Sequence, residues 1–186
     1  MLTENEALEL ERLLYEDAVH KSREHLLPFT ETTYEKFKAE WFHEKFYDIL
    51  DLFARRSIKN LIVSMPPQHG KSEGSSRRLP AYIAGKRPDD KLGVVCYSAD
   101  KAEKFGREIM TIMQEKTYKD IFPDVKYPQR GYTGQKANTN KNRESINSSG
   151  SMKFVGVGGP LTGDPIDVLI MDDLYKDWIE GNSPLI

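Results

Sequence analysis

The sequence predicts an α/β protein in which crossover helices flank a mostly parallel sheet. Two short apolar segments, 60–65 (NLIVSM) and 91–98 (KLGVVCYS), have the length and β-branched content of buried strands, and a helical pattern follows each. A third segment, 166–171 (IDVLIM), has the same character and leads into two aspartates. This alternation of strand and helix is typical of a sheet built from βα units. The 186 residues suffice for one compact domain.

Two helices are expected in an N-terminal helical segment, 1–56, ahead of the main α/β core, 57–186. Thr3 and Glu6 form a capping box that opens the first helix, which carries an apolar stripe and ends before Pro28. The second helix is expected over 34–56. The apolar stripe of the first helix is Leu10, Leu14 and Ala18, and that of the second is Phe37, Trp41, Phe42, Phe46, Ile49, Leu50 and Phe53.

Within the core, a helix is predicted from Gly70 to about Ala84, with Gly85 as its stop signal. Gly74 and Pro80 are poor residues for a helix interior, so this helix is expected to be kinked or shorter. Three further segments complete the core. They are a helix over 99–116 capped by Ser98 or Asp100, an exposed connection over 117–142, and two short strands around the turn 148–150.

Charge, cysteine count and apolar segments limit the class of protein to which the chain can belong. The net charge of −2 does not by itself indicate nucleic acid as a partner, and Cys96, the single cysteine, excludes an intrachain disulfide. No apolar segment approaches the length of a membrane span, and the acidic N-terminus does not resemble a secretory signal. His20, His25 and His43 show no metal-ligand spacing. We therefore expect a cytosolic protein.

The tripeptide Gly70-Lys71-Ser72 predicts a phosphate-binding loop, because an apolar strand precedes it and a helix follows it. In such a loop Gly70 allows close approach of the backbone to phosphate, Lys71 reaches the β- and γ-phosphates, and the Ser72 hydroxyl binds Mg²⁺. Met65 stands where the usual pattern has its first glycine, and the two prolines after it provide another fixed exit from the strand.

Asp172 and Asp173 supply the second half of this site. Asp172 ends the third strand, where a carboxylate would hold Mg²⁺, and Asp173 would polarise the attacking water. Adjacent carboxylates of an extended chain point in different directions, which suits two separate roles. Alone, the pair reads equally well as a helix N-cap or a strand-end turn. Together with the loop, it predicts a site for a nucleotide and Mg²⁺, with a group that could polarise the water for hydrolysis.

Four motifs appear in one order over about residues 40–175: LIVSMPPQHGKSE, VVCYSADKAEKFGREI, FVGVGGPLTG and DVLIMDD. In the residues and the order of these four motifs, the chain resembles the large terminase subunit of tailed bacteriophages. The resemblance implies an ATP-driven motor that pumps double-stranded DNA into a procapsid. It also implies a RecA-like core of the additional-strand class of P-loop ATPases.

The resemblance also assigns residues. It implies that Lys71 and Asp173 are catalytic and that Ser72 and Asp172 hold Mg²⁺. It further implies nucleotide contacts from the whole loop and from the aromatic segment before it. These additional contacts are Pro67, Gln68, His69, Gly70 and Glu73 in the loop, with Trp41 and His43 beside adenine. From the residues themselves, Gln68 and His69 either donate hydrogen bonds to the nucleotide or face solvent.

The implied partners are double-stranded DNA, the portal protein, the small terminase subunit and further copies of the chain. The resemblance implies a ring on the capsid and a monomer in solution. It places the protein in the host cytoplasm and transiently at the procapsid portal, with no membrane association. Lys136, Lys141 and Arg143 form either a DNA-contacting patch or a solvated loop.

The chain departs from the family pattern in two places, and each departure leads to an expectation. Asp164 stands where relatives often have an arginine after LTG, so a cation must come from elsewhere. The candidates are Arg77, Arg78, Arg130 and Arg143. The chain stops at Ile186, and we expect a truncated protein whose nuclease domain belongs only to the parent.

Two other functions fit the same residues. One is another additional-strand ATPase, such as a helicase or a recombinase-like protein. The other is a degenerate nucleotide-binding or assembly module without turnover, which Met65 and the short chain favour.

Overall fold

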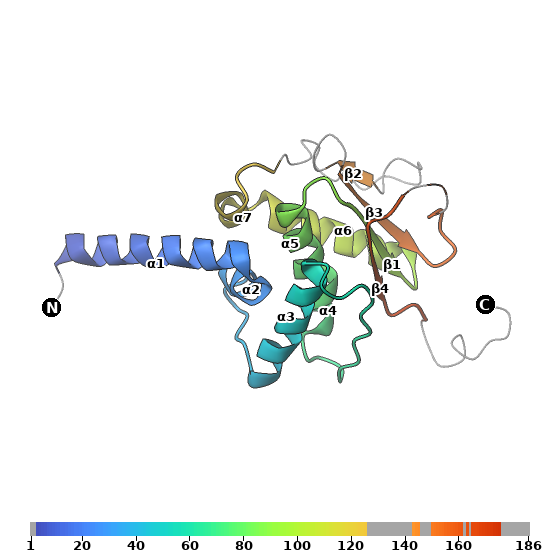
Figure 1. The fold of residues 1–186 in the computed structure, drawn as a ribbon, viewed down its shortest axis with the longest axis horizontal. Helices are drawn as coiled ribbons and strands as arrows, with labels where there is room; N and C mark the ends of the chain where they lie inside the picture. The colour runs from blue at the N-terminus through green and yellow to red at the C-terminus, as the bar shows by residue number, and fades with distance from the viewer. Residues whose placement is uncertain (1–2, 126–142, 146–149, 162, 164, 176–186) are drawn as a thin grey trace.

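A computed structural model describes residues 3–125, 143–145, 150–161, 163 and 165–175. Its centre is a sheet with the strand order β2-β3-β1-β4 (Figure 1). Strands β1 (Lys91–Cys96), β3 (Ser151–Gly156) and β4 (Val168–Asp172) run parallel, and β2 (Arg143–Ser145) pairs antiparallel with β3. The predicted α/β class with a mostly parallel sheet is confirmed, whereas the RecA-like assignment stays a prediction.

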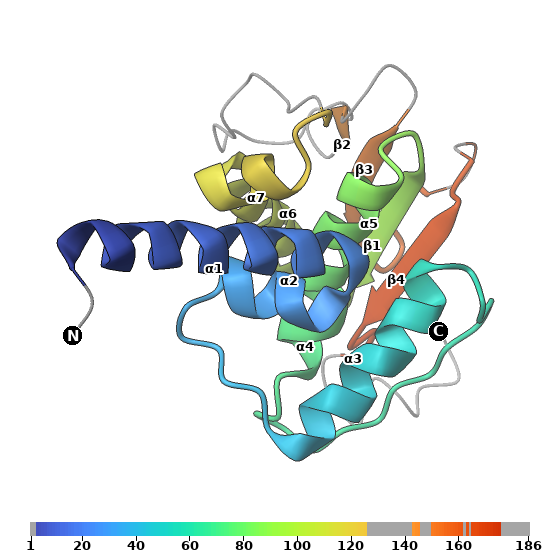
Figure 2. The same cartoon turned by 60° about the vertical axis from the view of Figure 1, so that its left-hand side comes forward.

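The helices lie on one side of this sheet (Figure 2). Their bounds are α1 (Glu4–Glu24), α2 (Leu26–Thr33), α3 (Trp41–Ala54), α4 (Lys71–Glu73), the π-helical turn η1 (Gly74–Arg78), α5 (Leu79–Lys86), α6 (Ala99–Gln114) and α7 (Lys116–Ile121). The Ser98 hydroxyl caps α6, which settles the predicted choice between Ser98 and Asp100. One hydrophobic cluster contains residues of the N-terminal helices, the sheet and α5–α7.

The sheet has a covered face and a more open face. Val94 pairs in register with Phe154 and Ile170, and all three are buried, with α6 approaching Phe154 through Gly106. On β4 the burial alternates, and Met171 is 61% exposed. The predicted strand at 166–171 is thus buried on one face only, because helices lie against one face of the sheet (Figure 2).

The predicted strand at 60–65 is wrong. Its residues have no regular secondary structure and make no backbone ladder with any described strand, and Ile62 is 96% exposed. Leu61, Val63 and Met65 still pack against the core. The alternation of side chains is thus as expected for a strand, but alternation alone does not supply a neighbouring edge to pair with.

The second helix is shorter than predicted. It begins at Trp41 rather than at residue 34, and Trp41 is 71% exposed. The buried face contains His43, Phe46, Tyr47, Leu50, Asp51 and Ala54. Ile49, predicted as core, lies on the exposed side. The prediction of a helix from the spacing of apolar residues is confirmed. The face of this helix that packs on the core, however, is rotated about the helix axis relative to the predicted apolar stripe.

The helix after the phosphate loop runs without a break from α4 through η1 to α5. The π-helical turn η1 is the irregularity that Gly74 and Pro80 predicted. Gly85 is not the stop signal, because α5 continues to Lys86. A Cβ at Gly85 would lie 2.2 Å from the Phe122 ring, and one at Gly74 would lie 2.7 Å from Phe46. Both glycines thus permit close packing between elements.

The expected exposed connection over 117–142 is wrong in its first part. Residues up to 121 form α7, and Tyr118, Ile121, Phe122 and Val125 are buried. Residues 126–142 lie outside the described part. The predicted strand pair is confirmed as β2 and β3. Of the predicted turn 148–150, only Gly150 belongs to the described residues.

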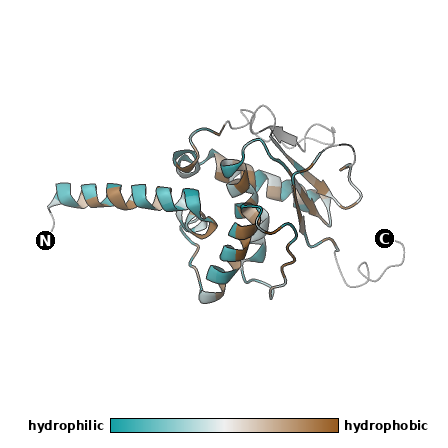
Figure 3. Cartoon of the chain, viewed as in Figure 1, coloured by the Kyte–Doolittle hydropathy of each residue, from teal (hydrophilic) through white to brown (hydrophobic). Residues whose placement is uncertain are grey.

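The capping box of Thr3 and Glu6 opens α1 as predicted. Pro28 does not mark the end of helical structure, because α1 already ends at Glu24 and Pro28 lies inside α2. The helix extends away from the body and is mainly hydrophilic (Figures 1 and 3). Leu10 and Leu14, predicted as a core stripe, are exposed, whereas Val19 further along is buried. In the part of the chain that the structure describes, no helix is both long and apolar enough to cross a membrane.

Candidate functional site

The predicted phosphate loop changes direction at two residues with positive φ. Gln68 has a φ of 63° and Gly70 a φ of 77°, and α4 starts directly after Gly70. Glycine adopts this left-handed conformation readily, whereas for Gln68 it is strained. The tight turn that a first glycine would allow is therefore made nearer to the helix. The loop presents Lys71 and Ser72 in the first turn of the helical run.

Lys71 and Ser72 meet the two aspartates, about a hundred residues later in the chain. The Ser72 hydroxyl donates to both carboxylate oxygens of Asp172, at 3.2 and 3.3 Å. The Lys71 ammonium lies 2.9 Å from Asp173 and 3.8 Å from Asp172. All four residues predicted to carry catalysis and metal binding thus lie in one place.

The two aspartates differ in burial and in backbone conformation. Asp172 ends β4 and is 3% exposed, whereas the side chain of Asp173 is about half exposed. Asp173 has a φ of 47°, so the chain has already left the extended conformation. The carboxylates therefore do not diverge as expected, and both face the same cations.

Lys101, in the first turn of α6, is a site residue that sequence reasoning missed. Its ammonium lies 3.0 Å from Asp173 and 3.5 Å from Asp172. In the parallel sheet Cys96 of β1 pairs with Asp172 of β4, so both strands end at one edge. A lysine five residues after β1 was the available signal, but using it required knowing that these two strands are neighbours.

Charge pairing shifts the pKa values in this cluster. Hydrogen bonds from Lys71 and Lys101 hold the pKa of Asp173 below its ordinary value. Burial alone would lower the pKa of Lys101, but the hydrogen bond to Asp173 and the charges of both aspartates raise it overall. Burial raises the pKa of the nearby Cys96 thiol to about 11, which keeps this thiol protonated and unreactive at neutral pH.

The donor set at Ser72 and Asp172 fits Mg²⁺. Among the described residues no group of three or more His, Cys, Asp or Glu side chains is arranged to hold a metal. Mg²⁺ needs no such group, because it retains waters and takes one or two protein oxygens plus phosphate oxygens. One buried carboxylate with a hydroxyl 3.2 Å away meets that requirement.

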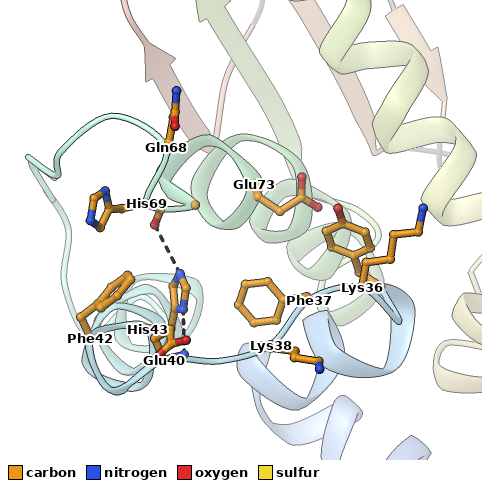
Figure 4. Close-up of a pocket in the computed structure, with 11 residues that line it drawn as sticks. Lys36, Phe37, Lys38, Glu40, Phe42, His43, Gln68, His69 and Glu73 are labelled. Carbon is orange, nitrogen blue, oxygen red and sulfur yellow. Dashed lines mark hydrogen bonds between the residues drawn. The ribbon is translucent and has the colours of Figure 1, made fainter.

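A pocket of about 590 Å³ opens beside the loop (Figure 4). Phe37, Phe42 and His43 line one side, and Gln68 and His69 line the other. Its mixed aromatic and polar lining suits a planar heterocycle. Trp41, predicted beside adenine, is not among the residues that line this pocket.

His43 holds the loop rather than only facing the pocket. Its Nδ1 accepts from the Glu40 backbone N–H at 3.0 Å, so the proton sits on Nε2, which donates to the His69 carbonyl at 3.3 Å (Figure 4). A Cβ on Gly70 would lie 3.0 Å from that Nε2. The packing of α3 therefore fixes where the phosphate loop turns.

The remaining loop residues have individual partners. Pro67, Gln68 and His69 are exposed, and the Pro67 carbonyl lies 2.8 Å from His69 Nδ1. Glu73 lines the pocket but also accepts from Arg78 Nε at 2.7 Å. The structure therefore uses Glu73 as an ion-pair partner within the helical run.

Two of the predicted candidate arginines are engaged inside the fold. Arg77 pairs with Glu108 at 2.5 Å and lies over the Phe105 ring. Arg78 is buried and also donates to the Thr33 carbonyl at 3.0 Å. The side chains of the other positions discussed from the sequence lie outside the described part of the structure. They are Arg130, Lys136, Lys141, Arg143 and Asp164.

No family model, curated protein or solved structure matches the chain.

Proposed function

We propose that this chain is the ATP-hydrolysing motor domain of a phage DNA-packaging terminase large subunit, with a RecA-like core. The observation that carries the ATPase part is the meeting of Lys71 and Ser72 with Asp172 and Asp173. A chance GKS tripeptide has no reason to lie beside a strand-end carboxylate pair a hundred residues away. The terminase part is supported by the four ordered motifs of the sequence.

The chain's own residues divide the work of binding. Gly70 brings the loop backbone close to the phosphates, and Lys71 exchanges its contact with Asp173 for the β- and γ-phosphate oxygens. Ser72 and Asp172 would hold Mg²⁺ through one hydroxyl and one carboxylate. When bound, Mg²⁺ neutralises charge on the phosphate oxygens. The pocket of Phe37, Phe42 and His43 would receive the base.

Asp173 orients the attacking water and accepts its proton. In the same step the water oxygen bonds to the γ-phosphorus, and the bond between the γ-phosphorus and the oxygen of the leaving ADP breaks. The release of Lys71 from Asp173 frees one carboxylate oxygen for that water. Its half-exposed side chain gives water access, which the buried Asp172 lacks.

Two variants test the ATPase site. Lys71→Ala should abolish ATP binding, because it removes the cation that reaches the phosphates. Asp173→Asn should keep binding and lose hydrolysis, because an amide does not accept the proton. Equilibrium binding and steady-state turnover measure the two effects separately. ATP affinity in Lys71→Ala equal to that of the unchanged protein would refute the site.

A second set of measurements tests the packaging role. DNA-stimulated turnover together with co-purification of portal or small terminase subunit would support it. Strand separation would instead indicate a helicase. Absence of turnover with and without DNA and partners would leave a nucleotide-binding assembly module.

A further inference from the structure

Lys101 has a position that the stability of its own helix does not explain. It lies in the first turn of α6, where the Ser98 hydroxyl accepts from its backbone N–H at 3.2 Å. A helix N-terminus carries partial positive charge and favours acidic side chains, so a lysine there is unfavourable. Its side chain is 23% exposed and therefore does not simply extend into solvent.

The Lys101 side chain is held in one direction. Its ammonium lies 5.1 Å from the centre of the Tyr97 ring and 5.8 Å from that of the Phe105 ring. These cation–π contacts and the ion pair with Asp173 hold the ammonium beside the two carboxylates. Each lysine contacts a different oxygen of Asp173.

The cluster is balanced in charge until phosphates enter it. Two carboxylates face two ammonium groups, and among the described residues the ion pairs of Asp172 and Asp173 come from Lys71 and Lys101. A bound triphosphate adds negative charge at this point. Arg77 is committed to Glu108, so it does not compensate that charge without breaking a partly buried pair.

We propose that Lys101 is a second phosphate-binding cation of the site, supplied by the same chain and contacting the terminal phosphate of a bound nucleoside triphosphate. The inference rests on the proposed ATPase function. An ammonium has three donors, and Asp173 occupies one of them, which leaves donors for phosphate oxygens. The terminal phosphate is the one concerned, because Asp173 acts on the water that attacks it.

Nucleotide selectivity tests this role. The chain is compared with Lys101→Gln in binding to ADP and to a non-hydrolysable ATP analogue, each with Mg²⁺. Loss of one charge-assisted hydrogen bond should weaken the analogue about tenfold and leave ADP nearly unchanged. Lys101→Arg keeps the cation and should restore most of the preference for the triphosphate.

Lys104→Gln is the matched control, because Lys104 lies one turn further along α6, is well exposed and is 4.0 Å from Glu108. It should bind both nucleotides like the unchanged chain. Lys101→Met retains the aliphatic stem over the two rings and replaces Lys101→Gln if that variant does not fold, as judged by circular dichroism.

Different results would refute the proposed function and the role of Lys101. If the unchanged chain binds neither nucleotide, both the proposed function and this role are wrong. If it binds both, and Lys101→Gln weakens ADP and the analogue equally or weakens neither, the role of Lys101 is wrong and the ATPase assignment stands.

Discussion

Gly70 is the residue at which the loop becomes a helix, and its backbone has a φ of 77°. We predict that Gly70→Ala destabilises the fold by about 1–2 kcal/mol, because a side chain is disfavoured in the left-handed conformation. It should also weaken ATP binding, because the new Cβ lies 3.0 Å from His43 Nε2 and displaces the loop. Urea denaturation and equilibrium nucleotide binding measure the two effects.

Gly158→Ala is the control for this prediction. Gly158 has the same φ of 77°, but no atom lies within 4 Å of a Cβ placed there. The control should therefore show the backbone penalty without a change in ATP affinity. Equal ATP affinities for the two variants would mean that the contact with His43 does not position the loop.

At the scale of single residues, the sequence indicated which types of residue form the site, but it did not identify every residue of the site. Lys71, Ser72, Asp172 and Asp173 were found because their local patterns are informative, and they do meet. Lys101 was missed because its importance depends on the distance to Asp173, and no local pattern encodes that distance.

Asp51 joins two elements, because it lies on α3 and accepts from the Leu26 backbone N–H at the start of α2. Burial raises the pKa of this carboxyl above its ordinary value. A group with a raised folded-state pKa contributes stability that is complete at low pH and is lost as pH rises through that pKa.

We therefore predict that the free energy of unfolding of Asp51→Asn rises relative to that of the unchanged chain between pH 4 and pH 7. The amide keeps the acceptor for Leu26 but never takes a charge. Urea denaturation of both proteins at several pH values measures the difference. A difference that is constant or falls with pH would contradict the prediction.

Gly85 is where α5 approaches the residue that follows α7. A Cβ there would lie 2.2 Å from the Phe122 ring, so Gly85→Ala should destabilise the fold by about 1–3 kcal/mol through overpacking. In a Phe122→Leu background the penalty of Gly85→Ala should be smaller, because the ring has been removed. A double-mutant cycle by thermal denaturation tests this, and additive effects would argue against a direct contact.

At the scale of the whole molecule, α1 is attached to the body mainly by its second half. Leu8 and Leu10 are exposed, whereas Val19 is buried. A variant that starts at Arg12 should thus change the free energy of unfolding by no more than about 0.5 kcal/mol. Val19→Ala, in contrast, should cost at least about 1 kcal/mol. Equal losses in the two variants would show that the first turns of α1 contribute to the core.

By itself, the sequence determined the α/β class, the capped helices, the strands β1, β3 and β4 and the residue types of the site. These features follow from side-chain periodicity, turn chemistry and caps, which act over a few residues. Only the tertiary structure decided that 60–65 has no described partner strand, that α3 turns His43 towards the loop, and that Lys101 joins the aspartates. Each of these depends on contacts between distant segments, which local sequence patterns do not encode.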